Sequence, residues 1–180
     1  FRNGTTKIRP GRYGFYCGVD EVGRGAIAGP IVAAAVIMPR GWYPTDLDDS
    51  KKLSKSKRMK LHDIMWKRVH CQVGVVSPKE IDEINVHNAS LLAMTRAIEG
   101  FRVLPPTVLI DGAYVPKELK SFSRAIVSGD SLVPSIAAAS IFAKVYRDKL
   151  MVSLSKRYPA YGWEKNVGYG TKHHLAAIRE

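Results

Sequence analysis

The chain has 180 residues, of which 46% are hydrophobic and 9% aromatic, and its 28 Lys and Arg against 16 Asp and Glu give a formal charge of +12. This composition excludes a disordered or fibrous chain and describes a globular domain that buries most of the surface of its unfolded form. A positive surface field attracts polyanions, so nucleic acid is the first partner to consider.

The beginning of the chain differs in composition from the rest. Residues 1–14 carry four cations among Gly, Thr and Pro and contain no apolar segment typical of a secretory signal. We therefore expect a basic, flexible tail over residues 1–14 and a single domain over residues 15–180. The longest strongly apolar stretch, residues 26–38, is shorter than the ~20 residues of a membrane span. We expect a soluble, cytoplasmic monomer with no membrane partner.

The two cysteines give no sign of a disulfide framework. Cys17 and Cys71 each lie in an apolar run, with no second cysteine nearby to form a metal-binding pair. Both are expected to be reduced residues of the core.

The first half of the chain predicts three strands and one helix. Two apolar runs rich in β-branched residues, 15–20 and 31–38, flank a segment with three glycines and predict two buried strands. Ser54 precedes apolar residues at helical spacing, which predicts a helix over residues 55–70 with Ser54 as its N-cap. Residues 71–76 predict a third strand.

The second half alternates helices and strands. Helical turns are expected over residues 78–84 and 89–99, and strands over residues 107–110 and 124–127. The Ala-rich segment 136–154, which follows a Pro-Ser pair, gives the strongest helix prediction. Three strands followed by alternating helices and strands indicate an α/β fold with a mixed sheet.

Four carboxylates stand at the ends of predicted strands. Asp20 and Glu21 follow the first strand, Asp111 comes where another strand meets a glycine, and Asp130 follows the last strand across Ser-Gly. Sites in open α/β sheets form at the carboxyl ends of strands, where loops approach a ligand. We therefore expect these acids at one edge of the sheet.

Packed acids repel one another unless divalent cations share them, and hard oxygen ligands select Mg²⁺ or Mn²⁺ over zinc. In a basic chain such a cluster suits a nuclease that uses metal ions to bind a phosphate and activate water. Each acid taken alone is more simply explained as a strand-end or capping carboxylate. On composition and spacing, a metal-dependent phosphodiesterase and a noncatalytic nucleic-acid-binding module therefore stay equally open.

A longer pattern decides between these alternatives. The string GVDEVGRG at residues 18–25, followed by Ala-Gly-Pro, resembles the opening motif of the ribonuclease HII family. Further blocks of the same family follow in order up to His174: they are DSKKL at 49–53, IDG at 110–112, GDS at 129–131, IAAASIFAKVYRD at 136–148 and GYGT at 168–171.

The resemblance implies a ribonuclease H-like fold, in which helices flank a five-stranded mixed sheet. It implies an endonuclease of DNA replication and repair that hydrolyses the RNA strand of RNA/DNA hybrids. It also implies incision 5′ of ribonucleotides embedded in duplex DNA, leaving 5′-phosphate and 3′-hydroxyl ends. By motif position Asp20, Glu21, Asp111 and Asp130 correspond to the family's catalytic, metal-binding carboxylates, which would hold two Mg²⁺ or Mn²⁺ ions.

The resemblance implies substrate contacts as well. Gly23-Arg24-Gly25 matches a turn whose main chain contacts the ribose 2′-OH at the RNA-to-DNA junction, where a missing Cβ allows close approach. Tyr169 matches a tyrosine that stacks near the junction sugar. Lys51 and Lys52 are candidate phosphate contacts. Asn85 is a weaker candidate of the same kind, because an Asn at the end of a helical turn commonly caps it.

Three other polar residues have competing interpretations. Asp148 is the acid most easily confused with the fourth ligand, but a helix-interior Arg-Asp pair more often makes local salt bridges, so we assign the role to Asp130. His173 and His174 lie near Tyr169 and are candidates for proton transfer or phosphate binding. A solvent-facing helix N-terminus is the favoured explanation of both.

Two departures from the family pattern and one related family need weighing. Val167 stands where the family usually has Lys, which is expected to remove a phosphate contact, and the chain stops before the family's usual C-terminal segment. The ribonuclease HIII type is an alternative, but it resembles a chain with an extra N-terminal domain and another residue in place of Arg24. A noncatalytic module that kept the fold is opposed by the four intact acids.

Overall fold

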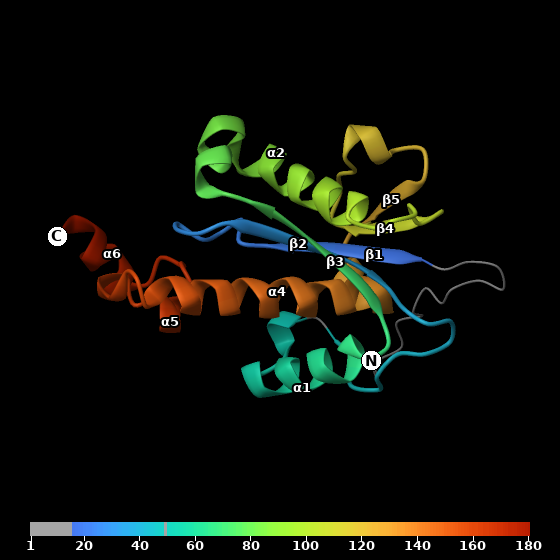
Figure 1. Ribbon diagram of the computed structural model, residues 1–180, viewed down its shortest axis with the longest axis horizontal. Coiled ribbons are helices and arrows are strands. Elements are labelled where there is room, and N and C mark those ends of the chain that lie inside the picture. The colour runs from blue at the N-terminus through green and yellow to red at the C-terminus, as the bar shows by residue number, and fades with distance from the viewer. Residues whose placement is uncertain (1–15, 49) are drawn as a thin grey trace.

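The computed structural model describes residues 16–48 and 50–180, and within them a five-stranded sheet lies between two layers of helices (Figure 1). The strand order is β3-β2-β1-β4-β5. β1 and β3 each run antiparallel to β2, whereas β4 runs parallel to both β1 and β5. The expected five-stranded mixed sheet is confirmed. The strands are β1 (Cys17–Val22), β2 (Ile31–Ile37), β3 (His70–Val76), β4 (Val108–Asp111) and β5 (Ser123–Ile126).

One long helix covers each face of the sheet (Figure 1). α2 packs on β2 and β3, and α4 packs on β1 and β2 with α1 outside it. The helices are α1 (Lys55–Trp66), α2 (Pro78–Glu99), α3 (Gly129–Leu132), α4 (Pro134–Ser155), α5 (Trp163–Asn166) and α6 (Lys172–Arg179), and short 3₁₀ turns cover Ser50–Lys52, Lys117–Leu119 and Pro159–Tyr161.

Small residues let the long helices approach the sheet closely. A methyl group on Gly18 of β1 would collide with the main chain of Ser135 in α4, and one on Gly74 of β3 would collide with the carbonyl of Ala93 in α2. Alanines of both helices are fully buried against the strands. The main chain of α4 therefore lies directly beside β1, the strand that ends at the acidic residues.

Most predicted elements are confirmed to within a few residues. Ser54 caps α1 by accepting a hydrogen bond from the Lys57 amide, as expected. The predicted helix 55–70 is too long, because α1 ends at Trp66 and the chain enters β3 at His70. The two expected runs of helical turns are the halves of α2, which is broken where Asn85 adopts a φ of 68°.

The remaining expectations have mixed outcomes. Both cysteines are unbridged thiols; Cys17 is buried and Cys71 half-buried, and burial raises the pKa of each to about 12. Among the described helices, none is long and apolar enough to cross a membrane. The expected tail, residues 1–14, lies outside the described residues.

Candidate active site

Three aspartates meet beside the carboxyl-terminal halves of β1 and β4. The register pairs Val19 with Ile110, so the residues that follow, Asp20 and Asp111, are neighbours on adjacent parallel strands. Asp130 comes from α3. One carboxylate oxygen from each of these aspartates lies within 4.8 Å of the others. We call this group the acidic trio.

Asp111 also builds the segment that carries Asp130. Its Oδ1 accepts hydrogen bonds from the main-chain amides of Gly129, at 2.7 Å, and of Asp130, at 3.4 Å. These amides begin α3 and have no acceptor inside the helix, so the carboxylate takes the place of a capping side chain. Ser128, with a φ of 56°, turns the chain from β5 into this short helix. Asp111 thus positions a second member of the trio, Asp130.

Burial and like charge act together on Asp20. Its pKa is raised well above the ordinary value, first by burial and then by the charges of Glu21 and Asp111. A hydrogen bond from the Ser140 hydroxyl and one of 2.7 Å from the Glu21 amide oppose the rise in pKa. The exposed Lys51 places Nζ 3.6 Å from Oδ2 of Asp130. Crowded, buried carboxylate oxygens are the hard donors that Mg²⁺ and Mn²⁺ prefer, so the trio fits a divalent cation.

Glu21 is the one predicted acid that the structure leaves outside the trio. Successive side chains of a strand point to opposite faces, so Glu21 projects away from Asp20. Its carboxylate instead contacts Nη1 of Arg24 at 3.3 Å. Burial is the main cause that raises the pKa of Glu21, and Arg24 opposes it. Glu21 therefore lies beside the trio: its charge raises the pKa of Asp20, and the charge of Asp111 raises its own pKa.

The glycine-rich turn after β1 and the loop that carries Tyr169 form one unit. The amides of Ile27 and Ala28 donate to the carbonyl of Gly168 at 2.9 and 3.2 Å. A methyl group on Gly25 would lie 4.0 Å from Cε1 of Tyr169. The structure therefore brings together the two segments that the sequence assigned to one recognition site.

Arg147 holds this unit together, and sequence reasoning did not anticipate its role. Its buried guanidinium donates to the carbonyls of Pro30 at 2.9 Å, Ala28 at 3.0 Å and Val167 at 2.8 Å. It also lies 5.6 Å from the centre of the Tyr169 ring. Burial lowers the pKa of Arg147, because the buried charge loses its contact with water. We call this arrangement the arginine knot.

The Arg-Asp pair expected in α4 does not form. Asp148 is bound instead by Lys144, four residues earlier, at 2.8 Å. Nζ of Lys144 also lies 5.4 Å from the centre of the Tyr169 ring. The placement of Asp148 in a local ion pair, outside the trio, agrees with the prediction that Asp130 and not Asp148 belongs at the carboxylate site.

His174 is wrongly predicted to face solvent. Its side chain is fully buried, because Nε2 accepts a hydrogen bond from the Trp163 indole at 3.0 Å and Nδ1 lies 2.9 Å from the carbonyl oxygen of Tyr169. The indole can only donate, so Nδ1 carries the proton and donates to the carbonyl. His174 therefore fixes the main chain of the Tyr169 loop. His173 is exposed, as expected.

The candidate phosphate contacts lie in two places. Lys51 and Lys52 belong to the 3₁₀ turn at Ser50–Lys52, and Lys52 donates to the Ser131 hydroxyl at 3.4 Å, so both lysines reach α3. Asn85 lies in α2, where Oδ1 accepts from the amides of His87 and Asn88. It caps the helical segment that follows it, rather than the turn that it was expected to end.

Val167 adopts an uncommon conformation. Its φ of 43° and ψ of 35° lie in the left-handed region, which β-branched residues avoid. The arginine knot holds its carbonyl at this position. The residue therefore contributes to the site through its main chain, whatever side chain stands there.

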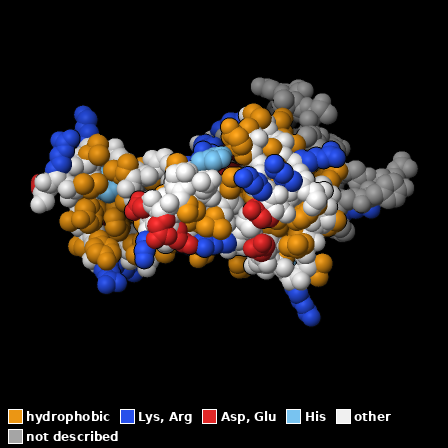
Figure 2. All heavy atoms as spheres, turned by 90° about the horizontal axis from the view of Figure 1, so that it is seen from above, with side chains coloured by type: hydrophobic (Ala, Val, Ile, Leu, Met, Phe, Trp, Pro, Cys, Tyr) orange, Lys and Arg blue, Asp and Glu red, His pale blue; other side chains and the backbone are white. Residues whose placement is uncertain are grey.

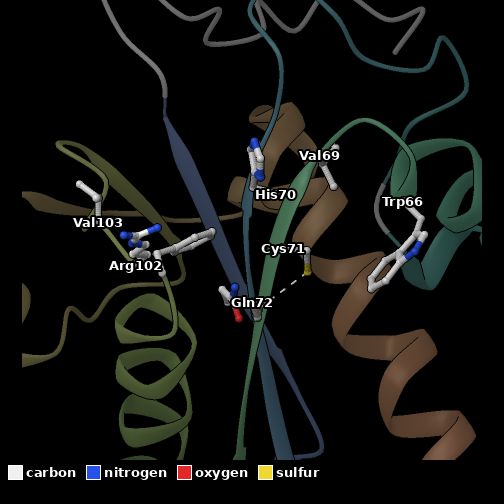
Figure 3. A pocket seen from close by; sticks show the side chains of 8 residues that line it. Trp66, Val69, His70, Cys71, Gln72, Arg102 and Val103 are labelled. Atoms are coloured by element: carbon white, nitrogen blue, oxygen red, sulfur yellow. Dashed lines mark hydrogen bonds between the residues drawn. The ribbon is translucent and has the colours of Figure 1, made fainter.

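Two hollows flank the sheet at different distances from the trio. One of about 180 Å³ opens between the turn at Gly23 and Arg24 and the first half of α2. The other, of about 520 Å³, lies over β3, the edge strand, between the end of α1 and the segment after α2 (Figure 3). In the second hollow Trp66 and Cys71 lie on the α4 side of the strand and Arg102 on the α2 side. Only the first hollow adjoins the predicted recognition turn.

The surface carries the charge that the composition predicts. On the face covered by α2, Lys and Arg side chains are spread widely, with small groups of Asp and Glu among them (Figure 2). The end of the molecule that holds the C-terminus shows many hydrophobic atoms (Figure 2), and Leu175 and Ile178 of α6 are among the exposed apolar residues.

Comparison with known proteins agrees with this geometry. The family model of ribonuclease HII matches residues 17–180. The chain belongs to the ribonuclease HII family. A ribonuclease HII of Burkholderia cenocepacia is 53% identical over 165 residues, which cover 91% of this chain and 77% of that protein. One of Ruegeria pomeroyi is 48% identical over 162 residues, covering 90% of this chain and 69% of that protein.

Solved structures place the fold in the same family. The ribonuclease H2 of Pyrococcus horikoshii aligns with a TM-score of 0.74 and 27% identity, covering 89% of this chain and 82% of that one. The ribonuclease HII in the PCNA complex of Archaeoglobus fulgidus aligns with a TM-score of 0.73 and 26% identity, covering 92% and 87%. The ribonuclease H-like fold is confirmed, and this ribonuclease HII family member is a ribonuclease H endonuclease.

Proposed function

We propose that this protein hydrolyses the RNA strand of RNA/DNA hybrids and incises on the 5′ side of single ribonucleotides embedded in duplex DNA. The products carry 5′-phosphate and 3′-hydroxyl ends. One observation carries the proposal: Asp20 of the acidic trio and the Gly23-Arg24-Gly25 turn stand at the end of the same strand, and Tyr169 lies beside that turn. A short segment of chain therefore holds the expected metal-binding residues next to the expected recognition residues.

The trio would hold divalent ions, with Glu21 as a further ligand from the neighbouring position. When bound, two Mg²⁺ or Mn²⁺ ions would supply activation of the attacking water and stabilisation of the leaving oxygen. Asp111 contributes twice, because the same carboxylate that faces the site orders the amides that carry Asp130. The pKa of Asp20 is high because the acids are buried and held close together before any ion binds.

Recognition would use rigid main-chain groups. RNA differs from DNA at the cut by one hydroxyl, and a site built to pair with that hydroxyl leaves its own polar groups unpaired when the hydroxyl is missing. The Gly23 turn is fixed by Gly168 and the arginine knot, and Tyr169 adds a flat surface at its side. Lys51 extends over Asp130 with its side chain 77% exposed, so it can also reach a phosphate.

The test is cleavage of a DNA duplex that carries one ribonucleotide, with and without Mn²⁺, beside an all-DNA duplex and an RNA/DNA hybrid. We expect metal-dependent incision 5′ of the ribonucleotide and no cleavage of the all-DNA duplex. Cleavage of the hybrid without incision at the single ribonucleotide would remove the second activity from the proposal. Binding to all three duplexes without cleavage would instead favour a noncatalytic binding module.

Two variants separate recognition from general binding. Tyr169→Ala should slow incision at a single ribonucleotide more than it weakens duplex binding. Lys51→Ala should weaken binding to any duplex and lower the log–log salt slope by about one unit, because one phosphate contact is lost. If Tyr169→Ala weakens binding to all-DNA and ribonucleotide-containing duplexes equally, this account of recognition fails while the carboxylate assignment stands.

A further inference from the structure

The imidazole of His174 connects two of the last helices of the chain to the main chain of Tyr169. His174 belongs to α6, and its side chain is fully buried. Nε2 accepts a hydrogen bond from the indole of Trp163 in α5 at 3.0 Å, and Nδ1 lies 2.9 Å from the Tyr169 carbonyl oxygen. Both nitrogens of this buried ring are therefore engaged.

Trp163 decides which nitrogen of His174 can donate. An indole N–H donates and cannot accept, so Nε2 is the acceptor and Nδ1 carries the ring proton. The Tyr161 ring stacks on Trp163, with ring centres 5.2 Å apart and planes inclined by 16°. The stacked indole therefore keeps His174 in the one tautomer that can donate to Tyr169.

The main chain of Tyr169 is held on both sides of the ring. Its amide donates to the Asn166 carbonyl at 2.9 Å, within the same loop. Its carbonyl accepts from the Thr171 amide at 2.8 Å, which is also a local contact. Nδ1 of His174 ties the same carbonyl to α6, outside the loop. The bond from His174 thus fixes the loop relative to the helices that follow it.

We propose that Trp163 and His174 are positioning residues that set the place of the Tyr169 ring, and through it the rate of incision at a ribonucleotide. The inference rests on the proposed function and adds two residues to it. The carbonyl carbon of Tyr169 is bonded to the Cα that carries the ring, so a shift of this carbonyl moves the ring. The preceding carbonyl, that of Gly168, is bound to the glycine-rich turn after β1, so the same shift would reach both recognition segments. A displacement of about 1 Å in a group that contacts substrate can lower a rate about 100-fold.

Two variants of His174 separate positioning from support of the fold. Asn places its amide nitrogen where Nδ1 stood, so His174→Asn can still donate to Tyr169 but loses the contact with Trp163. Gln places its amide oxygen where Nε2 stood, so His174→Gln keeps the contact with Trp163 but loses the donor to Tyr169. We expect incision of a saturating single-ribonucleotide duplex to slow at least about 10-fold in His174→Gln and much less in His174→Asn.

The controls concern binding and an unrelated histidine. Binding of an all-DNA duplex should stay at the wild-type level in both His174 variants, because the loss falls on the catalysed step. His70 is an exposed histidine of β3, and His70→Asn should change neither incision nor binding. Equal slowing in His174→Asn and His174→Gln would overturn the inference and leave His174 as a support of the fold.

A double variant tests whether His174 acts through the Tyr169 ring. In Tyr169→Ala there is no ring to position, so adding His174→Gln should slow incision little further, as expected for coupled residues. Two losses that multiply would show that His174 acts by another route, and the inference would be overturned.

Trp163→Phe guards against His174 variants that do not fold. It keeps an aromatic ring beside Tyr161 but removes the donor to His174, so both tautomers become accessible. Nitrogen NMR shifts of the His174 ring, measured without substrate, should show the proton on Nδ1 in the wild type and on either nitrogen in Trp163→Phe. Incision should slow by a smaller factor than in His174→Gln. A wild-type proton on Nε2, or unchanged incision in Trp163→Phe with mixed tautomers, would overturn the inference. A wild type with its proton on Nδ1 that does not incise at ribonucleotides would instead overturn the proposed function.

Discussion

The acidic trio and the arginine knot both bury charge near β1, but in opposite ways. In the trio, like charges crowd together, and burial raises the pKa of Asp20. In the knot, the Arg147 guanidinium donates to carbonyls of three separate residues. Crowded like charges destabilise a fold even with the exposed Lys51 beside Asp130, whereas a buried cation with satisfied donors ties segments together. The comparison indicates that the trio is arranged to bind a cation, whereas the knot stabilises the fold as it stands.

The largest effect is expected from the trio. Asp111→Asn keeps the shape of the side chain but removes a charge needed for metal binding and weakens the capping of α3, so cleavage should fall by orders of magnitude. The fold should survive, since an amide oxygen can still accept from the Gly129 amide. Single-turnover cleavage and a thermal melt check both statements. Near-normal cleavage by the folded variant would falsify the role of the trio.

The second prediction separates the trio from an acid outside it. Asp130→Asn should raise the Mn²⁺ concentration needed for half-maximal cleavage and lower the rate strongly. Asp148→Asn is its control, because Asp148 is already bound by Lys144 and lies outside the trio. Metal titrations of the two variants decide the matter. A raised metal requirement in Asp148→Asn alone would mean that the wrong acid was assigned.

The third prediction addresses the knot. Arg147→Met should lower the free energy of unfolding by about 3 kcal/mol, because buried carbonyls of Pro30, Ala28 and Val167 lose their donor. Lys149→Met removes a cation from an exposed position of the same helix and should cost less than about 1 kcal/mol. Urea denaturation measures both values. Equal losses would show that Arg147 acts as an ordinary cation.

The same contrast explains which parts of the site were predictable. Strands and their terminal acids follow from local patterns of apolar residues, and Asp20, Asp111 and Asp130 were found in this way before the structure. Alternation along a strand also accounts for the position of Glu21 beside the trio and not within it. The role of Glu21 as a further ligand comes from the motif resemblance and stays a prediction.

The knot and the buried histidine could not be found from residue types. The acceptors of Arg147 are main-chain carbonyls up to 119 residues away, and every residue has a carbonyl. No pattern of side chains marks such a contact in advance. The prediction for His174 was wrong for a related reason. Thr171 caps the start of α6, as the sequence pattern suggests, but the His174 imidazole is buried against the indole of Trp163. A helix start near the surface does not show which of its side chains turn inward.

The smallest predicted effect tests the energetic side of the comparison in protein kept free of metal by EDTA. The folded-state pKa of Asp20 lies above its value in the unfolded chain, so the folded state holds the proton more tightly. Stability from this group is therefore greatest below the ordinary aspartate pKa of about 3.9, and it declines as the pH rises toward the raised value. Glu21, whose pKa is also raised, acts in the same direction.

Asp20→Asn has no such proton to lose. Its melting temperature should exceed that of the wild type by more at pH 8 than at pH 5, by several degrees at most, and the Asp148→Asn control should show no gain that grows with pH. Saturating Mg²⁺ should reverse the order at pH 8, because an ion that binds only the folded wild type stabilises it by mass action. A gain that is the same at both pH values would mean that charge repulsion at Asp20 is relieved without a metal. The trio would then not differ from the knot in its need for a bound cation.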